Sequence, residues 1–208
     1  MIGAVKQQYA AIREDWDRGL AGEAKRSAVV FFLLVLLAFG LCAALPALRD
    51  TLVELAVSSL GGLAAVDGSG RLSPVLLFQN NLRACGMIML YGLVPFILLP
   101  ALSLGLNAMI LGVLAAWYLS EGLPLSAYFA ALIPHGVFEL PAVILAFAVG
   151  LYASGQVTGR IRRREGCRSV TECLLLMGRT LTLVQLPLLA VAALAEAYVT
   201  PLIAAAFL

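Results

Sequence analysis

The sequence predicts an all-α, polytopic membrane protein, and three observations carry this prediction. Of the 208 residues, 62% are hydrophobic and only 12% are charged, whereas soluble domains carry about 25% charged residues. Long apolar segments recur along the chain. Basic residues concentrate in two of the polar segments between them. The net charge of +2, without interleaved aromatic and basic residues, argues against a nucleic-acid partner.

Residues 1–26 are expected to form an amphipathic helix at the membrane surface, and residues 27–208 a single transmembrane helical domain. Val5, Tyr9, Ile12 and Trp16 recur at spacings of three and four, which places them on one helical face. The polar face carries both signs of charge and suits the lipid interface or a protein partner. The segment is not a signal peptide, because the apolar run starts only at Ser27.

About five spans are expected. The first, of about 19 residues, is about 28 Å long as a helix, which is enough to cross the hydrocarbon core. Pro46 ends it, and a short helix follows on the far side. Ser73 and Pro74 read as the start of the second span. The third is expected to kink near Pro100 and the fifth near Pro187. The five spans are residues 27–45, 74–91, 95–119, 135–154 and 173–199.

The distribution of lysine and arginine predicts the orientation. Residues 1–26 and 155–172 carry five each, whereas residues 46–73 carry two and residues 120–125 none. By the positive-inside rule, the rich segments face the cytoplasm. We therefore expect a multi-pass protein of the cytoplasmic (inner) membrane, with a cytoplasmic N-terminus and the 46–73 segment outside.

The most informative stretch is Pro-His-Gly-Val-Phe-Glu-Leu-Pro at residues 134–141. His135, the only histidine, and Glu139 lie four residues apart and therefore on one helical face. Pro134, Gly136 and Pro141 predict a helix break here, which would leave residues 126–133 as a short re-entrant or interfacial helix. A broken, charged segment within apolar sequence indicates an internal site.

Other polar residues within the spans complete a candidate functional cluster. Its expected members are Asn80, Asn81, Arg83, Asn107, His135 and Glu139. Alternatively, the asparagines form hydrogen bonds between helices. His135 and Glu139 would then pair only with each other at the start of a helix. An arginine inside the bilayer is costly unless another group compensates its charge. Arg83 and Glu139 are expected at similar depths in the bilayer, so Glu139 is the expected ion-pair partner of Arg83. Arg179 and Glu196 lie nearer span ends and are expected to reach the surface.

No catalytic residue, cofactor or metal site is expected. A single histidine cannot build a two-histidine zinc site, and the four cysteines match no zinc spacing. The expectation is therefore a non-enzymatic protein. Ala108, Gly112 and Ala116 repeat every fourth residue, a stripe that allows close helix approach and favours a homodimer. The alternative is a contact between spans of one chain.

The order of these motifs resembles the stage II sporulation protein M family of bacterial and archaeal membrane proteins. The resemblance covers roughly residues 79–155: Gln79-Asn80-Asn81-Leu82-Arg83, then Asn107 with Gly112, then the stretch 134–141, and Gly150. It implies an all-helical membrane protein and, in sporulating bacteria, a membrane partner in a complex whose other subunits cut peptidoglycan. Many members occur in organisms that never sporulate, so sporulation itself does not transfer.

Two functions therefore fit the sequence. The first is a membrane scaffold, in contact with the lipid bilayer, that recruits envelope-remodelling proteins. The second is a transporter or channel for a small solute or ion, which would use His135, Glu139 and Arg83. Flux in liposomes that depends on Glu139 would favour transport. Envelope proteins that co-purify with the chain would favour the scaffold.

Overall fold

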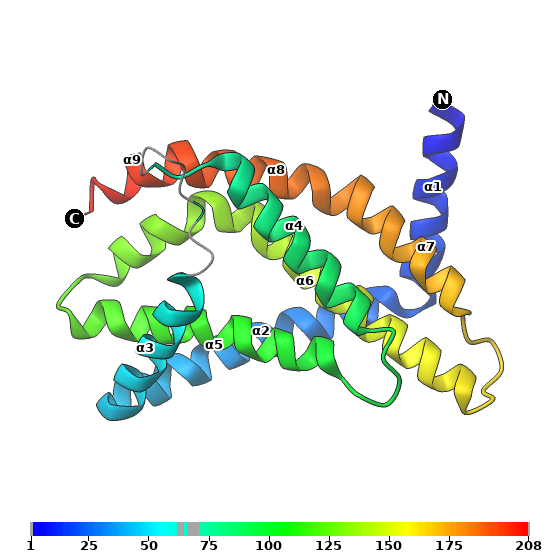
Figure 1. Ribbon diagram of the computed structural model, residues 1–208, viewed down its shortest axis with the longest axis horizontal. Helices are drawn as coiled ribbons and strands as arrows, with labels where there is room; N and C mark the ends of the chain where they lie inside the picture. Colours follow the sequence, from blue (N-terminus) through cyan, green and yellow to red (C-terminus); the bar gives the residue numbers. More distant parts are fainter. Residues whose placement is uncertain (1, 62–64, 66–70, 208) are drawn as a thin grey trace. The chain divides into compact units, whose positions relative to one another are not determined.

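The described part of the chain, residues 2–61, 65 and 71–207 of a computed structural model, contains helices and no strand (Figure 1). The all-α prediction is confirmed. In chain order the elements are α1 (Ile2–Asp15), η1 (Trp16–Leu20), α2 (Ala21–Ala44), α3 (Pro46–Gly61), α4 (Pro74–Tyr91), α5 (Leu99–Ser120), α6 (Leu125–Ile161), α7 (Val170–Thr180), η2 (Leu181–Gln185), α8 (Leu186–Leu194), η3 (Ala195–Val199) and α9 (Thr200–Ala204). The elements η2 and η3 are single turns of π-helix, whereas η1 contains the non-helical Gly19 and marks a kink between α1 and α2.

Four helical stretches among the described residues are long and apolar enough to cross a membrane: Val5–Ala44, Leu99–Ser120, Leu125–Ile161 and Val170–Ala204. The chain is therefore a multi-pass membrane protein. The predicted second span forms as α4, a helix of 18 residues. It is not one of the four, because its asparagines and Arg83 lower its hydropathy. Membrane crossing by α4 stays a prediction.

The chain divides into two compact units. Unit 1 comprises Met1–Val29, Leu82–Leu104 and Pro141–Leu188. Unit 2 comprises Val30–Asn81, Gly105–Leu140 and Leu189–Leu208. The chain passes from one unit to the other within helices, so each unit is built from segments that are far apart in the sequence. The expected division into an interfacial helix and one membrane domain stays a prediction about membrane placement.

In unit 1, α1 packs on α7 (Figure 1). The hydroxyl of Tyr9 donates to the carbonyl of Leu183 at 3.1 Å, and Arg179 donates to Gln8 at 2.6 Å. Leu183 lies four residues before Pro187, which has no N–H to offer its carbonyl, so Tyr9 supplies the missing donor. Arg179 thus contacts α1, whereas the sequence suggests only that it reaches the membrane surface.

The expected helix over residues 1–26 is bent at Gly19, which adopts a φ of 147°. Glycine reaches this region readily because it has no Cβ. Leu20 is fully buried after the bend. From Ala21, α2 continues without interruption through the first span to Ala44. Residues 21–26 are therefore continuous with the helix of the first span, while the predicted membrane boundary at residue 26 stays a prediction.

In unit 2, α3 packs against α2 and α5 through a small apolar core. Its exposed side carries Asp50 and Glu54. α3 is the short helix expected after Pro46. The core has Cys42, Val113 and Ala116 at its centre, with Phe39, Leu52, Val53 and Met109 packed around them.

The small-residue stripe of α5 also lies inside unit 2. Ala108 and Ala116 are buried. A Cβ atom added to Gly112 would lie 2.7 Å from the Cβ of Ala38 and would overlap the carbonyl oxygen of Val35. The stripe therefore seats α2 against α5 within one chain, which corrects its expected use as a dimer contact. A homodimer stays a prediction without this support.

α6 is one helix of 37 residues. Helical hydrogen bonding continues through Pro134, Gly136 and Pro141, which corrects the separate helix expected over residues 126–133; these residues form the first turns of α6. Each proline removes only one backbone donor, and membrane helices tolerate this because the adjoining turns keep their hydrogen bonds.

The other two expected kinks also take different forms. α5 begins at Leu99, so Pro100 occupies its first turn, where a missing N–H costs nothing. The turn before it contains Phe96 with a positive φ of 63°. Pro187 lies just after the π-helical turn η2, within the continuous helical stretch Val170–Ala204.

Candidate functional site

The candidate site is a cluster of one imidazole and two carboxylates in unit 2. His135 and Glu139 lie one turn apart on α6, as their spacing predicts, and Glu196 comes from η3. One ligand atom from each residue lies within 4.8 Å of the other two. All three side chains are partly buried. They belong to helical stretches that are long and apolar enough to span a membrane.

Two neighbours orient these side chains. The hydroxyl oxygen of Thr200 lies 3.2 Å from Nδ1 of His135, which is a hydrogen bond. The side-chain amide of Asn81 is hydrogen-bonded to the carboxylate of Glu139. The bond at Nδ1 leaves Nε2 as the ring nitrogen available to a further partner.

Asn81, His135 and Glu139 are the expected cluster members that the structure brings together. Asn80 and Asn107 belong to the same unit, Asn80 partly buried on α4 and Asn107 exposed on α5. Arg83 is exposed on the part of α4 that belongs to unit 1. Its pairing with Glu139 stays a prediction.

Sequence reasoning missed Glu196, which was expected to reach the membrane surface. The contact joins helices whose contacting residues, His135 and Thr200, are 65 residues apart in the chain. One signal was present: Glu196 and Thr200 are one helical turn apart, in a C-terminal stretch that has no other acidic residue after Glu172.

A second polar network lies in unit 1 and was also not anticipated. Arg168, from the basic loop, forms ion pairs with Asp15 at 2.5 Å and with Glu172 at 3.1 Å. Ser169 caps α7 and exchanges hydrogen bonds with Glu172 in a capping box. Burial alone lowers the pKa of Arg168, but its bonds to Glu172 and Asp15 outweigh this and raise that pKa above its ordinary value.

The chemistry of the unit 2 cluster is that of a cation or proton site. Two carboxylates offer negative oxygen atoms, and a neutral imidazole offers one nitrogen lone pair. The hydroxyl of Thr200, 3.2 Å from Nδ1 of His135, bonds the ring and holds it in place. The cluster suits reversible binding of a cation or a proton.

Comparison with known proteins agrees with this architecture. The family model for stage II sporulation protein M matches residues 27–201. The chain belongs to this family. An uncharacterized protein of the archaeon Methanocaldococcus jannaschii is 30% identical over 128 residues, which cover 62% of this chain and 71% of that protein. No solved structure matches.

Family membership extends well beyond the stretch that carries the resemblance in sequence. One motif position in that stretch, Gly150, has a plain structural role in unit 1. A Cβ atom added to it would lie 2.8 Å from the carbonyl oxygen of Ile88 and 3.0 Å from the Cγ of Pro100. Only glycine lets α6 approach α4 and α5 this closely, so this motif position serves packing, whereas His135 and Glu139 serve the polar site.

Proposed function

We propose that this chain is a non-enzymatic scaffold of the cytoplasmic membrane that holds proteins which remodel the cell envelope. The observation that carries the proposal is membership of the stage II sporulation protein M family across residues 27–201. The family resemblance implies a membrane partner of enzymes that cut peptidoglycan. The similar archaeal protein favours a general envelope role over a sporulation role.

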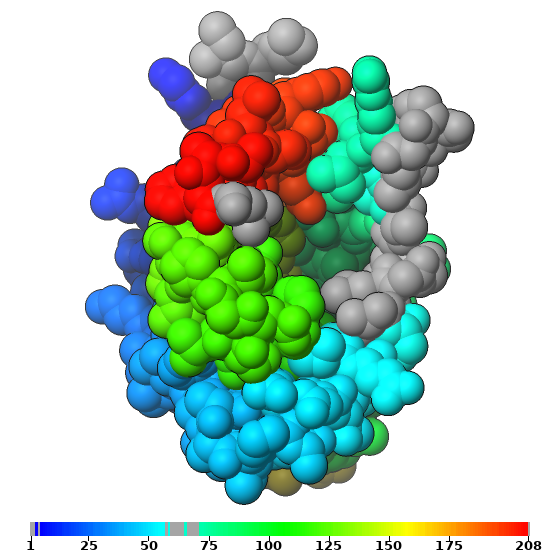
Figure 2. Space-filling model, turned by 90° about the vertical axis from the view of Figure 1, so that its left-hand side faces the viewer, coloured from blue at the N-terminus to red at the C-terminus, as the bar shows by residue number. Residues whose placement is uncertain are grey.

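The surface of α3 is the part of unit 2 best suited to a partner outside the membrane. Figure 2 shows α3, in cyan, on the surface of unit 2 beside the green turn between α5 and α6. Its inner side rests on the core of unit 2. Its outer side exposes Asp50, Glu54 and Leu55. A helix fixed on one side and exposed on the other offers a preorganised surface.

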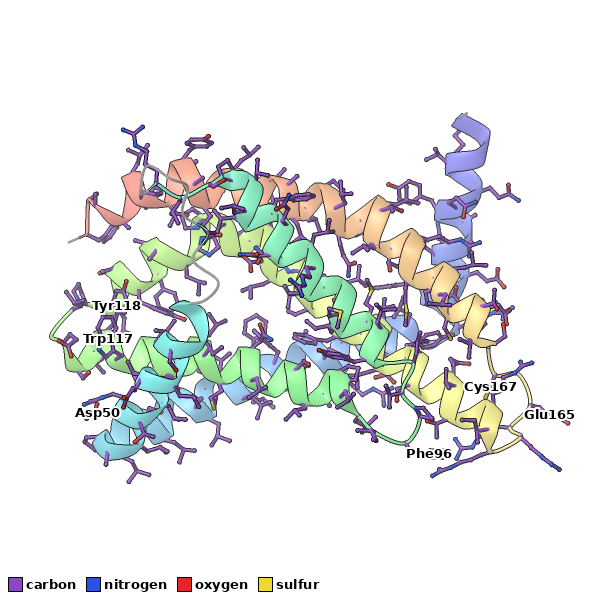
Figure 3. All side chains as sticks on the ribbon, in the orientation of Figure 1. Asp50, Phe96, Trp117, Tyr118, Glu165 and Cys167 are labelled. Carbon is purple, nitrogen blue, oxygen red and sulfur yellow. The ribbon has the colours of Figure 1, made fainter. Side chains whose placement is uncertain are left out.

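Aromatic residues support a membrane boundary at this end of unit 2. Trp117 and Tyr118 lie at the end of α5, at the same end of the unit as Asp50 of α3 (Figure 3). Tyr118 and Tyr128 pack edge to face with ring centroids 5.6 Å apart. Tryptophan and tyrosine concentrate where the bilayer meets water. With the positive-inside rule, this end is the outer one.

The orientation is tested with reporter fusions. A reporter after Arg164 is expected to be read in the cytoplasm, and one inserted at Glu121, between α5 and α6, outside it. Both readings on one side would contradict the proposed topology.

The scaffold is tested by reversing the charges on α3. Replacement of Asp50 and Glu54 with lysine is expected to reduce cross-linking to envelope enzymes and to impair the envelope. Both positions are exposed and the variant loses only the ion pair of Asp50 with Arg49 at 2.8 Å, so the melting temperature is expected to fall by no more than about 4 °C. The matched control reverses Glu165, an exposed acid of the unit 1 loop. Unchanged cross-linking in the α3 variant would contradict the docking surface.

Transport of a small cation is the second candidate, favoured by the His135, Glu139 and Glu196 cluster on helices able to span the membrane. Glu139→Gln separates the two functions. If this variant loses liposome flux and has an envelope defect, while the variant with lysine at Asp50 and Glu54 has neither, transport replaces the scaffold. If Glu139→Gln changes neither flux nor the envelope, while the α3 variant has an envelope defect, the scaffold stands.

A further inference from the structure

The two carboxylates of the unit 2 cluster lie close enough for their charges to repel. Charged side chains within a membrane are costly unless a partner compensates them. Among the ion pairs formed in the described part of the chain, none includes Glu139 or Glu196. A cation that binds both carboxylates at once would therefore stabilise Glu139 and Glu196.

The donor atoms are arranged to meet one ion. The ligand atoms of His135, Glu139 and Glu196 are no more than 4.8 Å apart. An ion at the centre of such a triangle lies within about 3 Å of each atom, and rotamer adjustments of under about 1 Å bring the donors to the 2.0–2.2 Å typical of Zn²⁺. The ligands come from two helical stretches, so a bound ion would also link them.

The surrounding contacts are those expected around metal ligands. Histidine ligands usually bond through their second ring nitrogen to an oxygen atom, and ligating carboxylates are usually hydrogen-bonded themselves. Thr200 occupies Nδ1 of His135, and Asn81 bonds the carboxylate of Glu139. These two contacts hold the imidazole and the Glu139 carboxylate in place, which distinguishes the cluster from a chance gathering of acids.

We propose that His135, Glu139 and Glu196 bind one divalent first-row transition-metal ion in unit 2. The imidazole selects against Mg²⁺ and Ca²⁺, which prefer ligand sets made of oxygen, while two carboxylates suit Mn²⁺, Fe²⁺, Co²⁺ or Zn²⁺. Three protein ligands leave coordination positions for water or an anionic solute. The sequence argues against a zinc site because it has only one histidine, but the carboxylate of Glu196 takes the place of a second histidine ligand. The proposal is independent of the scaffold.

The experiment uses the full chain, free of any histidine tag, purified in detergent and stripped of metal with a chelator. Co²⁺ is the first probe, because its visible absorption reports coordination by nitrogen and oxygen, and a thiolate ligand would add a separate charge-transfer band. Metal analysis then gives the stoichiometry. Since His135 is the only histidine, selective ¹⁵N-histidine labelling gives signals from one residue, whose ring nitrogens are followed on addition of Zn²⁺.

The expected result is one Co²⁺ or Zn²⁺ per chain, a large shift of the Nε2 signal, and little response to Mg²⁺. Glu139→Gln and Glu196→Gln should each weaken binding by more than 100-fold, and Thr200→Val by about 10-fold. Glu121→Gln, an exposed acid outside the cluster, is the matched control and should bind as wild type.

Three outcomes would overturn the proposal. These are no binding to the wild-type chain, a thiolate band in its Co²⁺ spectrum without a shift at His135, and wild-type affinity in both glutamine variants. If a glutamine variant fails to fold, the histidine signals of the wild-type chain decide alone. An Nε2 signal that does not move at saturating Zn²⁺ rejects the site.

Discussion

The ion pair between Asp15 and Arg168 fastens the N-terminal helix of unit 1 and offers the sharpest test of its packing. The side chain of Asp15 is only 5% exposed and that of Arg168 18% exposed. Removing one member of a buried pair typically costs about 3–5 kcal/mol, because the other charge is left buried and unpaired. The structure predicts that the two single replacements are not equally costly.

Asp15→Asn should cost about 3 kcal/mol, near the lower end of that range, because Arg168 retains Glu172 at 3.1 Å. Arg168→Met should cost about 4–5 kcal/mol, because it strands the almost fully buried carboxylate of Asp15. The double variant strands neither charge. Its loss should therefore fall short of the sum of the single losses by about 2 kcal/mol or more.

The measurement is unfolding of the purified protein in a mild detergent, with trypsin cleavage after Lys6 and Arg13 as a local readout for detachment of α1. Exposed neighbours in the same loop supply the matched controls, Arg163→Met and Glu165→Gln, which should change stability by less than about 0.5 kcal/mol. Single losses that add to within about 0.5 kcal/mol in the double variant would refute the reasoning. Unchanged cleavage of α1 in both single variants would refute the proposed fastening.

Three further predictions concern single contacts inside the units. Gly112→Leu should abolish folding or cost several kcal/mol, because α2 leaves no room for a side chain there, whereas Gly105→Leu, with open space around its Cβ position, should fold with normal yield. Tyr9→Phe should cost about 1 kcal/mol, because it removes the donor to the carbonyl of Leu183. Gln185→Leu should change stability by less than about 1 kcal/mol, because it loses the hydrogen bond from Nε2 to the carbonyl of Ala142 at 3.2 Å but also removes a buried Oε1 that has no partner among the described atoms. Unfolding in detergent measures all three, and a loss above about 2 kcal/mol for Gln185→Leu would contradict the last.

The helices could be predicted from the sequence because their signals are local. Hydropathy located the four long apolar helices, and Ser73 followed by Pro74 marked the start of α4. In the structure, Ser73 accepts a hydrogen bond from the amide of Leu76 at 3.4 Å. The stripe of small residues was also recognised. What the sequence did not reveal was its partner, because a stripe on α5 fits a second copy and a neighbouring helix equally well.

The polar sites were harder to predict because their contacts are not local. Asp15 and Arg168 are 153 residues apart in the chain, and no local pattern links them. Glu196 looked like a residue near a helix end until the fold placed it beside His135. The proline motif is a local signal, and it wrongly predicted a separate helix over residues 126–133. Its local preference for a break was outweighed by the hydrogen bonds of the turns on either side, so α6 continues through it.

That continuity changes how the motif at residues 134–141 is understood. A helix that runs through Pro134 and Pro141 cannot donate the usual hydrogen bonds to the carbonyls of Ala130 and Val137, and each interior proline costs about 3 kcal/mol. Sequences break local rules mainly where another requirement compensates. Here the two prolines bracket the only histidine and its acidic neighbour, and both of these side chains contact other parts of unit 2. The prolines are therefore better explained by the polar site than by a need to end a helix, since α6 does not end there.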